Sequence, residues 1–121
     1  MAFYRHLFDE WPVAYACHRI LYNHDNMPVD SVIVDVNKAF ERLVGFDRNR
    51  ILWRKATEIY KQAQMIDLDW NFFLQKALTY NKEFNYLFIW RGHYYEIKAC
   101  CPERGFVAVT IEEARSLPTL T

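Results

Sequence analysis

Two pairs of neighbouring residues have side chains that could act as nucleophiles or metal ligands: Cys17 with His18, and Cys100 with Cys101. Neighbouring residues of a strand point to opposite faces, so neither pair can join a nucleophile to its base or close on one metal ion. Metal sites also favour separated ligands, as in C-x-x-C. We therefore interpret the cysteines as small apolar residues, and the sequence predicts no catalytic residue and no metal site.

The other titratable residues are scattered along the chain. No Ser/His/Asp arrangement, glycine-rich phosphate loop or H-E-x-x-H pattern occurs. Asp35, Glu58 and His18 are the best candidates for acid–base chemistry, yet none has a partner at motif spacing. The alternative function is therefore a small cone-shaped α+β enzyme with a deep pocket, which requires convergent titratable groups in that pocket.

The balance of charges restricts the partners. Lys and Arg number 15 and Asp and Glu number 15, which gives a net charge of zero. A general nucleic-acid binder needs a cationic face, so we expect no nucleic-acid partner. The weak self-repulsion permits association with a second copy. One local basic cluster is either a solvated face or an anion-binding rim, and it comprises Arg48, Arg50, Arg54 and Lys55.

The 121 residues suffice for one domain with a packed core, because 52% are hydrophobic and 17% are aromatic. Three cysteines are too few for a disulfide scaffold and fit a reducing cytosol. No apolar run approaches the roughly 20 residues of a membrane span, and no signal-peptide pattern occurs. We expect a cytoplasmic domain with no membrane insertion by this segment.

Residue patterning predicts a helix and then two strands in the first third of the chain. Apolar residues at helical spacing predict a helix over residues 3–11 that Pro12 stops. β-branched and aromatic residues predict strands over residues 13–22 and 31–36. Pro28 is expected to keep the segment between them irregular.

A helical region follows these strands. Asn37 can cap a helix that ends at Gly45. Residues 54–66 are expected to form only a short helical turn and a connector. The clearest helix starts at Asp67 or Asp69. Its apolar stripe, predicted to be core, comprises Trp70, Phe73, Leu74, Ala77 and Leu78.

Three strands are predicted in the last third of the chain, over residues 83–90, 93–101 and 106–111. A tight turn at Arg91-Gly92 connects the first two, and a four-residue turn at residues 102–105 connects the last two. Together these elements predict an α+β fold. Its five-stranded antiparallel sheet has helices packed on one face and the N-terminal helix outside.

The strand over residues 83–90 is apolar on both faces, which is unusual for a half-exposed antiparallel sheet. One face can meet the helices, and the other can meet the N-terminal helix, a partner chain or both. The alternative is that scattered apolar residues are normal on a surface. The candidate residues for a homodimer interface are Phe3, Leu7, Phe8, Trp11, Leu87 and Ile89.

Five segments, in order, resemble PAS domains. Residues 35–46 resemble the family motif D-x-N-x-A-F-x-x-L-T-G-Y/F, and residues 51–59 resemble the I-I-G-K-x-x-x-E-I segment that follows it. Residues 92–97 resemble the strand motif G-x-W-Y-x-I. Residues 101–109 resemble S-P-x-x-G-Y-F-x-x, the turn and last strand of the family. Residues 14–22 are similar to the opening strand of PAS domains found ahead of diguanylate cyclase (GGDEF) and histidine kinase domains. The resemblance spans about residues 8–115.

The resemblance implies a sheet that cups a small cavity under the helices, in a non-catalytic sensory or dimerising module of a bacterial-type signalling protein. Such a module passes its state to an effector domain in the same or a partner chain. The implied division is a flanking helix over residues 1–12, a PAS domain over 13–115 and a tail over 116–121. The implied cavity residues are Val34, Phe40, Leu43, Trp53, Ile59, Phe73, Leu74, Ala77, Tyr95 and Ile97.

Two departures from the family pattern stand out. Trp53 occupies a position where the family usually has glycine, so we expect its ring to plug the cavity or its mouth. Residues 111–115 stand where the family has F-x-D-I-T, the motif that leads into the helix coupling sensor to effector. Ala114 and Arg115 replace its Ile-Thr pair.

PAS domains bind haem, flavin, small carboxylates or no known ligand. A flavin-photochemical member would need a reactive cysteine in an N-C-R-F-L-Q-like helix, and residues 49–60 contain no cysteine. Haem needs an axial ligand, and no histidine lies on the predicted central helices. We therefore predict no haem or flavin, and leave open an unknown small molecule or a cavity filled by side chains.

Overall fold

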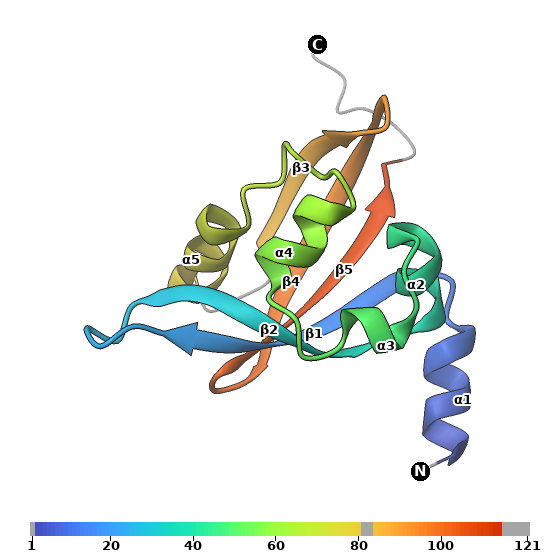
Figure 1. Cartoon of the computed structure of the whole chain (residues 1–121), viewed down its shortest axis with the longest axis horizontal. Helices are drawn as coiled ribbons and strands as arrows, with labels where there is room; N and C mark the ends of the chain where they lie inside the picture. Colours follow the sequence, from blue (N-terminus) through green and yellow to red (C-terminus); the bar gives the residue numbers. More distant parts are fainter. Residues whose placement is uncertain (1, 81–83, 115–121) are drawn as a thin grey trace.

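Helices cover one face of a single sheet in the computed structural model, which describes residues 2–80 and 84–114 (Figure 1). The helices are α1 Ala2–Glu10, α2 Lys38–Val44, α3 Arg48–Ile51, α4 Ala56–Gln62 and α5 Trp70–Tyr80. The strands are β1 Ala14–Tyr22, β2 Pro28–Val36, β3 Phe84–Trp90, β4 His93–Glu103 and β5 Phe106–Glu113.

The five strands lie in the order β2-β1-β5-β4-β3, and every neighbouring pair is antiparallel. The first and last strands therefore meet in the middle of the sheet, where Ala14 lies opposite Ile111. The helices α2 to α5 lie over one face, and α1 projects from the start of β1 (Figure 1). The predicted α+β fold is confirmed.

Strand periodicity separates a core face from an outer face. On β1, Ala16 and His18 are buried toward the helices, while Tyr15 faces the other way. On β3, Phe88 and Trp90 are buried, and Ile89 between them is exposed. The hydrophobic core thus lies between the sheet and α2 to α5.

Asn37 joins the start of the sheet to the helices. Its Oδ1 accepts hydrogen bonds from the backbone N–H groups of Phe40 and Tyr15, both at 3.0 Å. Its Nδ2 donates to the Val13 carbonyl at 2.8 Å. Gly45 ends α2 with a φ of 83°, a left-handed conformation that glycine adopts without strain. The two predicted ends of this helix are confirmed.

Three local predictions are wrong. β2 begins at Pro28 opposite Tyr22, because an edge strand tolerates a residue that lacks an N–H. Residues 56–62 form a regular helix, α4, whose apolar side chains find partners in the core. The predicted four-residue turn is shorter, because Glu103 already pairs with Phe106.

Some predictions fall outside the described residues. They concern the side chains of Phe3, Cys100 and Cys101, the strand start at residue 83, and residues 115–121.

Candidate functional site

Most of the residues that the resemblance placed around a cavity lie in or against the core between the sheet and the helices. Six of the ten implied cavity residues are buried, namely Phe40, Ile59, Phe73, Leu74, Ala77 and Ile97. Val34, Leu43 and Tyr95 are half-buried. The six buried residues belong to one core, and Leu43 and Tyr95 pack against it. Contact of any of these residues with a ligand stays a prediction.

Trp53 is placed differently. Its side chain is 69% exposed, so the expectation that its ring plugs the core cavity is wrong. The reason is a backbone connection to β2: the Trp53 N–H donates to the Ile33 carbonyl at 2.8 Å, and the Ile33 N–H donates to the Arg54 carbonyl at 3.0 Å. With a φ of 67°, this connection turns the indole toward solvent.

A polar cluster lies inside the aromatic core. His18 Nε2 and the Tyr60 hydroxyl share a hydrogen bond of 3.1 Å. The His18 ring stacks on Trp70 with a centroid distance of 4.5 Å. Trp70 Nε1 in turn donates to Ser31 Oγ at 3.1 Å. The cluster links β1, β2, α4 and α5 through polar contacts that no core of aliphatic residues would provide.

Burial controls the protonation of this cluster. It lowers the pKa of His18 from 6.5 to about 3, and the backbone of Val107 and Ala16 opposes this shift only in part. Burial also raises the pKa of Tyr60 above its ordinary value. His18 is therefore neutral at neutral pH, and its Nδ1 has no hydrogen-bond partner among the described residues.

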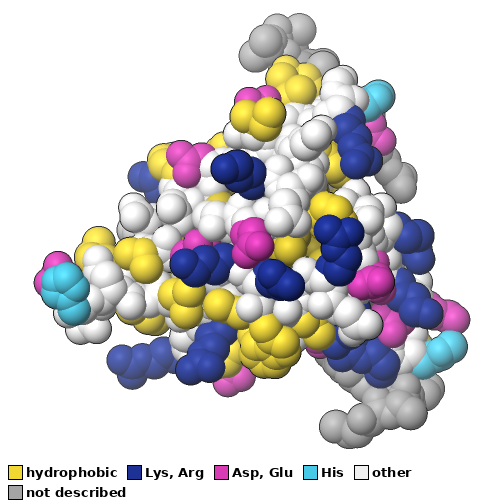
Figure 2. Space-filling model, viewed as in Figure 1, with side chains coloured by type: hydrophobic (Ala, Val, Ile, Leu, Met, Phe, Trp, Pro, Cys, Tyr) yellow, Lys and Arg dark blue, Asp and Glu magenta, His cyan; other side chains and the backbone are white. Residues whose placement is uncertain are grey.

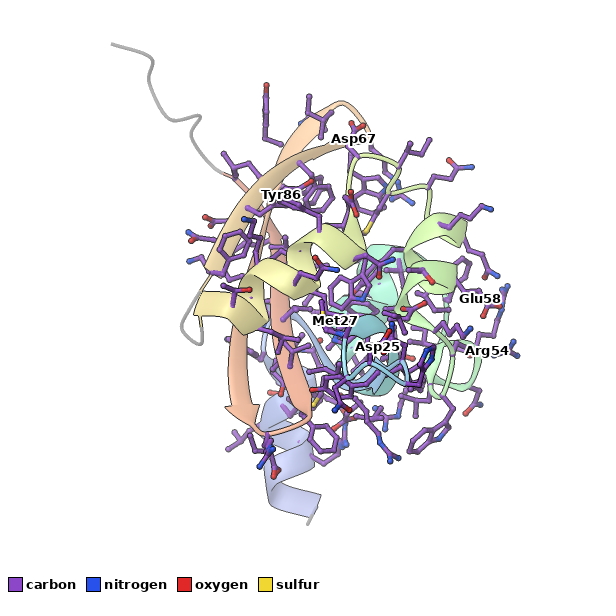
Figure 3. All side chains as sticks on the ribbon, turned by 90° about the vertical axis from the view of Figure 1, so that its left-hand side faces the viewer. Asp25, Met27, Arg54, Glu58, Asp67 and Tyr86 are labelled. Carbon is purple, nitrogen blue, oxygen red and sulfur yellow. The ribbon has the colours of Figure 1, made fainter. Side chains whose placement is uncertain are left out.

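A surface pocket of about 350 Å³ lies between α4 and the start of α5. Tyr60 and Trp70 form part of its lining, so the buried cluster lies behind it. Its other lining residues are Thr57, Lys61, Met65, Ile66, Leu68, Asp69 and Asn71. The connector between the two helices is tied to the sheet by the Tyr86 hydroxyl, which donates to the Asp67 carbonyl at 3.0 Å (Figure 3).

A second candidate site lies on the outside of the molecule, at α1. Phe8 meets Tyr15 edge-on with a centroid distance of 4.9 Å. Arg5 Nη2 donates to both carboxylate oxygens of Asp35 at 3.1 Å, and Arg48 Nη1 donates to the same carboxylate at 2.9 Å. These contacts fix α1 on the outer side of β1.

Apolar side chains remain exposed around this helix and across the outer sheet face. Leu7, Phe8, Trp11 and Tyr15 line an open groove of about 270 Å³. On the outer face, Leu87 and Ile89 of β3 are exposed next to Tyr94 of β4, which pairs with Ile89.

The three residues considered for acid–base chemistry do not converge. Asp35 bonds to Arg5 and Arg48, and Glu58 lies beside Arg54 on the solvent side of α4 (Figure 3). His18 bonds to Tyr60 inside the core. The structure therefore assembles no acid–base pair from these candidates.

Residues 2–80 and 84–114 contain neither a cluster of metal ligands nor a membrane-spanning helix. No group of three or more His, Cys, Asp and Glu side chains there could hold a metal ion. No helix in that part of the chain has the length and apolarity to cross a bilayer.

Comparison with known proteins identifies structural neighbours only. No protein-family model and no curated protein matches the sequence. An RNA-binding light-oxygen-voltage receptor is similar over 93% of this chain and 32% of its own, with a TM-score of 0.65 and 14% identity. A Rhodobacter sphaeroides LOV protein is similar over 93% and 65%, with a TM-score of 0.64 and 17% identity. A PAS domain of an HTR-like protein from Haloarcula marismortui is similar over 93% and 90%, with a TM-score of 0.50 and 16% identity.

These neighbours share the sheet and helix arrangement described above. The chain has the PAS fold. The resemblance read from the sequence is thus confirmed for the fold, and identities this low show the fold alone. The chain spans about a third of the first PAS-fold neighbour and about two thirds of the second.

The buried cluster of this PAS fold was missed by sequence reasoning. The sequence pattern offers His18 as the neighbour of Cys17 and as an acid–base candidate with no partner at motif spacing. Its position among Ala14, Ala16 and Ile20, which share its strand face, could have indicated burial. Nothing in the sequence indicated Tyr60 as its partner, 42 positions along the chain.

Proposed function

We propose that the domain is a sensory or regulatory PAS module that pairs with a second copy and passes its state to an effector domain. The observation that carries this proposal is the exposure of apolar side chains on α1 and on the outer face of β3. The exposed fraction is 54% for Leu7, 43% for Trp11 and 46% for Ile89. Exposed apolar side chains that share one face of a domain favour an interaction surface.

Sheet topology supports two copies rather than one. Within one chain, β5 and β4 lie between β1, where α1 is fixed, and β3. The helix therefore lies away from the Leu87, Ile89 and Tyr94 surface of its own chain, but it can cover that surface of another copy. In a two-fold dimer, α1 of each copy would cover the β3 surface of the other copy. Because the net charge is zero, electrostatic repulsion between the two copies is weak.

The ends of the sheet provide a route for the signal. Ala14, just after α1, lies opposite Ile111 near the end of β5. A shift of α1 between two packed positions would therefore act at the strand from which the chain leaves the domain. We propose a diguanylate cyclase or histidine kinase as the effector, in the same or a partner chain, because residues 14–22 resemble PAS domains of that context.

A small molecule is a second candidate input. The pocket between α4 and α5 supports it, because Lys61 and Asp69 supply charges of both signs at its rim and aromatic rings line it.

We infer that the module uses neither haem nor flavin. Residues 49–60 contain no cysteine, and the ring of His18 is held by Tyr60 and Trp70. We also propose a cytoplasmic location from the sparse cysteines, and protein rather than nucleic-acid partners from the charge balance.

Native mass spectrometry of gently purified protein tests three of these proposals together: the pairing of two copies, the bound small molecule and the lack of haem and flavin. We expect a dimer, and we expect Ile89→Glu to convert it to a monomer because the charge would be buried at the interface. Met27→Glu is the matched control, since Met27 is 52% exposed and lies between β1 and β2, off both surfaces. A monomeric wild type, or equal behaviour of the two variants, contradicts the pairing. Extra mass equal to flavin or haem contradicts the cofactor inference, and any other retained mass identifies the ligand.

A further inference from the structure

Trp53 combines two features that a folded domain ordinarily avoids. Its φ is 67°, and its side chain is 69% exposed. A left-handed φ crowds the Cβ of every residue except glycine, and bulky side chains rarely adopt it. The tryptophan thus sits in a strained backbone position without burying its ring.

The fold itself requires only the backbone at this position. The hydrogen bonds that tie residues 53 and 54 to Ile33 involve main-chain atoms, and glycine would make them with less strain. The indoles of Trp70 and Trp90 donate hydrogen bonds, to Ser31 and to the Ala63 carbonyl. Among the described residues, the Trp53 indole has no hydrogen-bond partner, and no other ring or cation lies over it. Both faces of its ring are therefore open to a partner.

The sequence neighbours of Trp53 are rich in basic residues. Residues 48–55 include four cations and no acidic residue. Arg48 is bonded to Asp35, whereas Arg50 lies over the Phe46 ring and Arg54 is 3.7 Å from Glu58. Lys55 is exposed. Figure 2 shows basic side chains on the front face above a hydrophobic patch at the lower rim, where Figure 1 places the connection between α3 and α4.

We propose that Trp53, Arg50, Arg54 and Lys55 form a docking surface for an acidic segment of a partner protein. A hydrophobic side chain of that segment packs on the indole, and its carboxylates pair with the three cations. The small size of the patch, on a chain of zero net charge, fits a short peptide better than a long phosphate backbone. This surface is separate from α1 and the outer face of β3, so it does not depend on the pairing proposed above.

Fluorescence anisotropy with a dye-labelled synthetic peptide tests this surface. The probe has glutamates flanking a central Leu-Phe pair, and the control peptide has lysines in place of the glutamates. We expect saturable binding of the acidic peptide only, weakened by at least about tenfold in Trp53→Gly and in Trp53→Asn, which also tolerates a left-handed φ. Arg50→Ala and Lys55→Ala should weaken it too, while Arg104→Ala, which removes an exposed cation between β4 and β5, should not.

Thermal unfolding of the same variants separates docking from folding. Trp53→Gly and Trp53→Asn should keep Tm within about 3 °C of the wild type, because the indole contributes little to the core. A large fall in Tm would make the ring structural and overturn the proposal. Equal binding of the acidic and basic peptides, or tighter binding of oligouridylate RNA or of phosphatidylserine vesicles, would also overturn it.

Discussion

A neutral histidine at the centre of an aromatic core links the stability of this domain to pH. His18 is fully buried, and its hydrogen bond to Tyr60 together with its stacking on Trp70 replaces the water that the ring loses. The unfolded chain binds a proton at His18 near pH 6.5, whereas the folded chain binds it only near pH 3. Between these values the unfolded state holds more protons, so acid favours unfolding.

We predict that the free energy of unfolding falls by about 1 to 2 kcal/mol from pH 6.5 to pH 5 because of His18. The double variant His18→Leu with Tyr60→Phe removes the titrating group and its partner together, so its stability should change less over this range. Urea titrations at both pH values measure the difference. His24→Gln is the control, because it removes an exposed histidine. A double variant with the wild-type pH dependence would contradict the prediction.

At the scale of elements, the side chain of Asn37 connects the start of β1 to the start of α2. Asn37 is fully buried and makes three hydrogen bonds, to the backbone of Tyr15, Phe40 and Val13. Asp47 caps α3 in the same local manner, but it is exposed and its side chain accepts from Arg50 at 3.2 Å. The two caps therefore share a local motif and differ in what they join.

Replacement of Asn37 by alanine should lower the free energy of unfolding by about 3 kcal/mol, because it leaves buried backbone groups without partners. Asp47→Ala should lower it by only about 0.5 to 1 kcal/mol, the usual effect of losing an exposed helix cap. Chemical denaturation of both variants gives the comparison. Similar losses in the two would show that the links to β1 contribute nothing beyond the cap.

At the scale of the whole molecule, α1 is both fixed to its own domain and open to another. Arg5 bonds to Asp35, and Phe8 packs on Tyr15. Leu7 and Trp11 remain exposed beside them. An arrangement of this kind allows the helix to exchange partners, or to bridge two copies, without unfolding the sheet.

Deletion of residues 1–11 should weaken the dimer or the solubility of the protein while the remaining domain stays folded, because the deletion uncovers the Tyr15 ring. Light scattering after gel filtration reports the oligomer, and circular dichroism reports the fold. A deletion product that stays soluble and dimeric like the wild type would show that α1 has no role in association.

The sequence by itself determined the order of the elements and several of their ends. Helix ends at Asn37 and Gly45 follow from side-chain capping and from a left-handed glycine, which depend on neighbouring residues only. The Arg91-Gly92 turn and the two-sided apolarity of β3 follow from the same short-range rules. Five ordered motifs then indicated the PAS fold before any long-range contact was known.

Only the tertiary structure decided which side chains meet. His18 and Tyr60 are joined across 42 positions, and the local pattern of neither residue predicts the other. Trp53 was expected to plug the cavity or its mouth, because it replaces the glycine that the family usually has there. A backbone connection to Ile33 on β2 turns it outward, and such a contact is invisible to a sequence read by short-range spacing. Packing between distant segments is a property of the whole chain, and that is where the candidate sites of this domain arise.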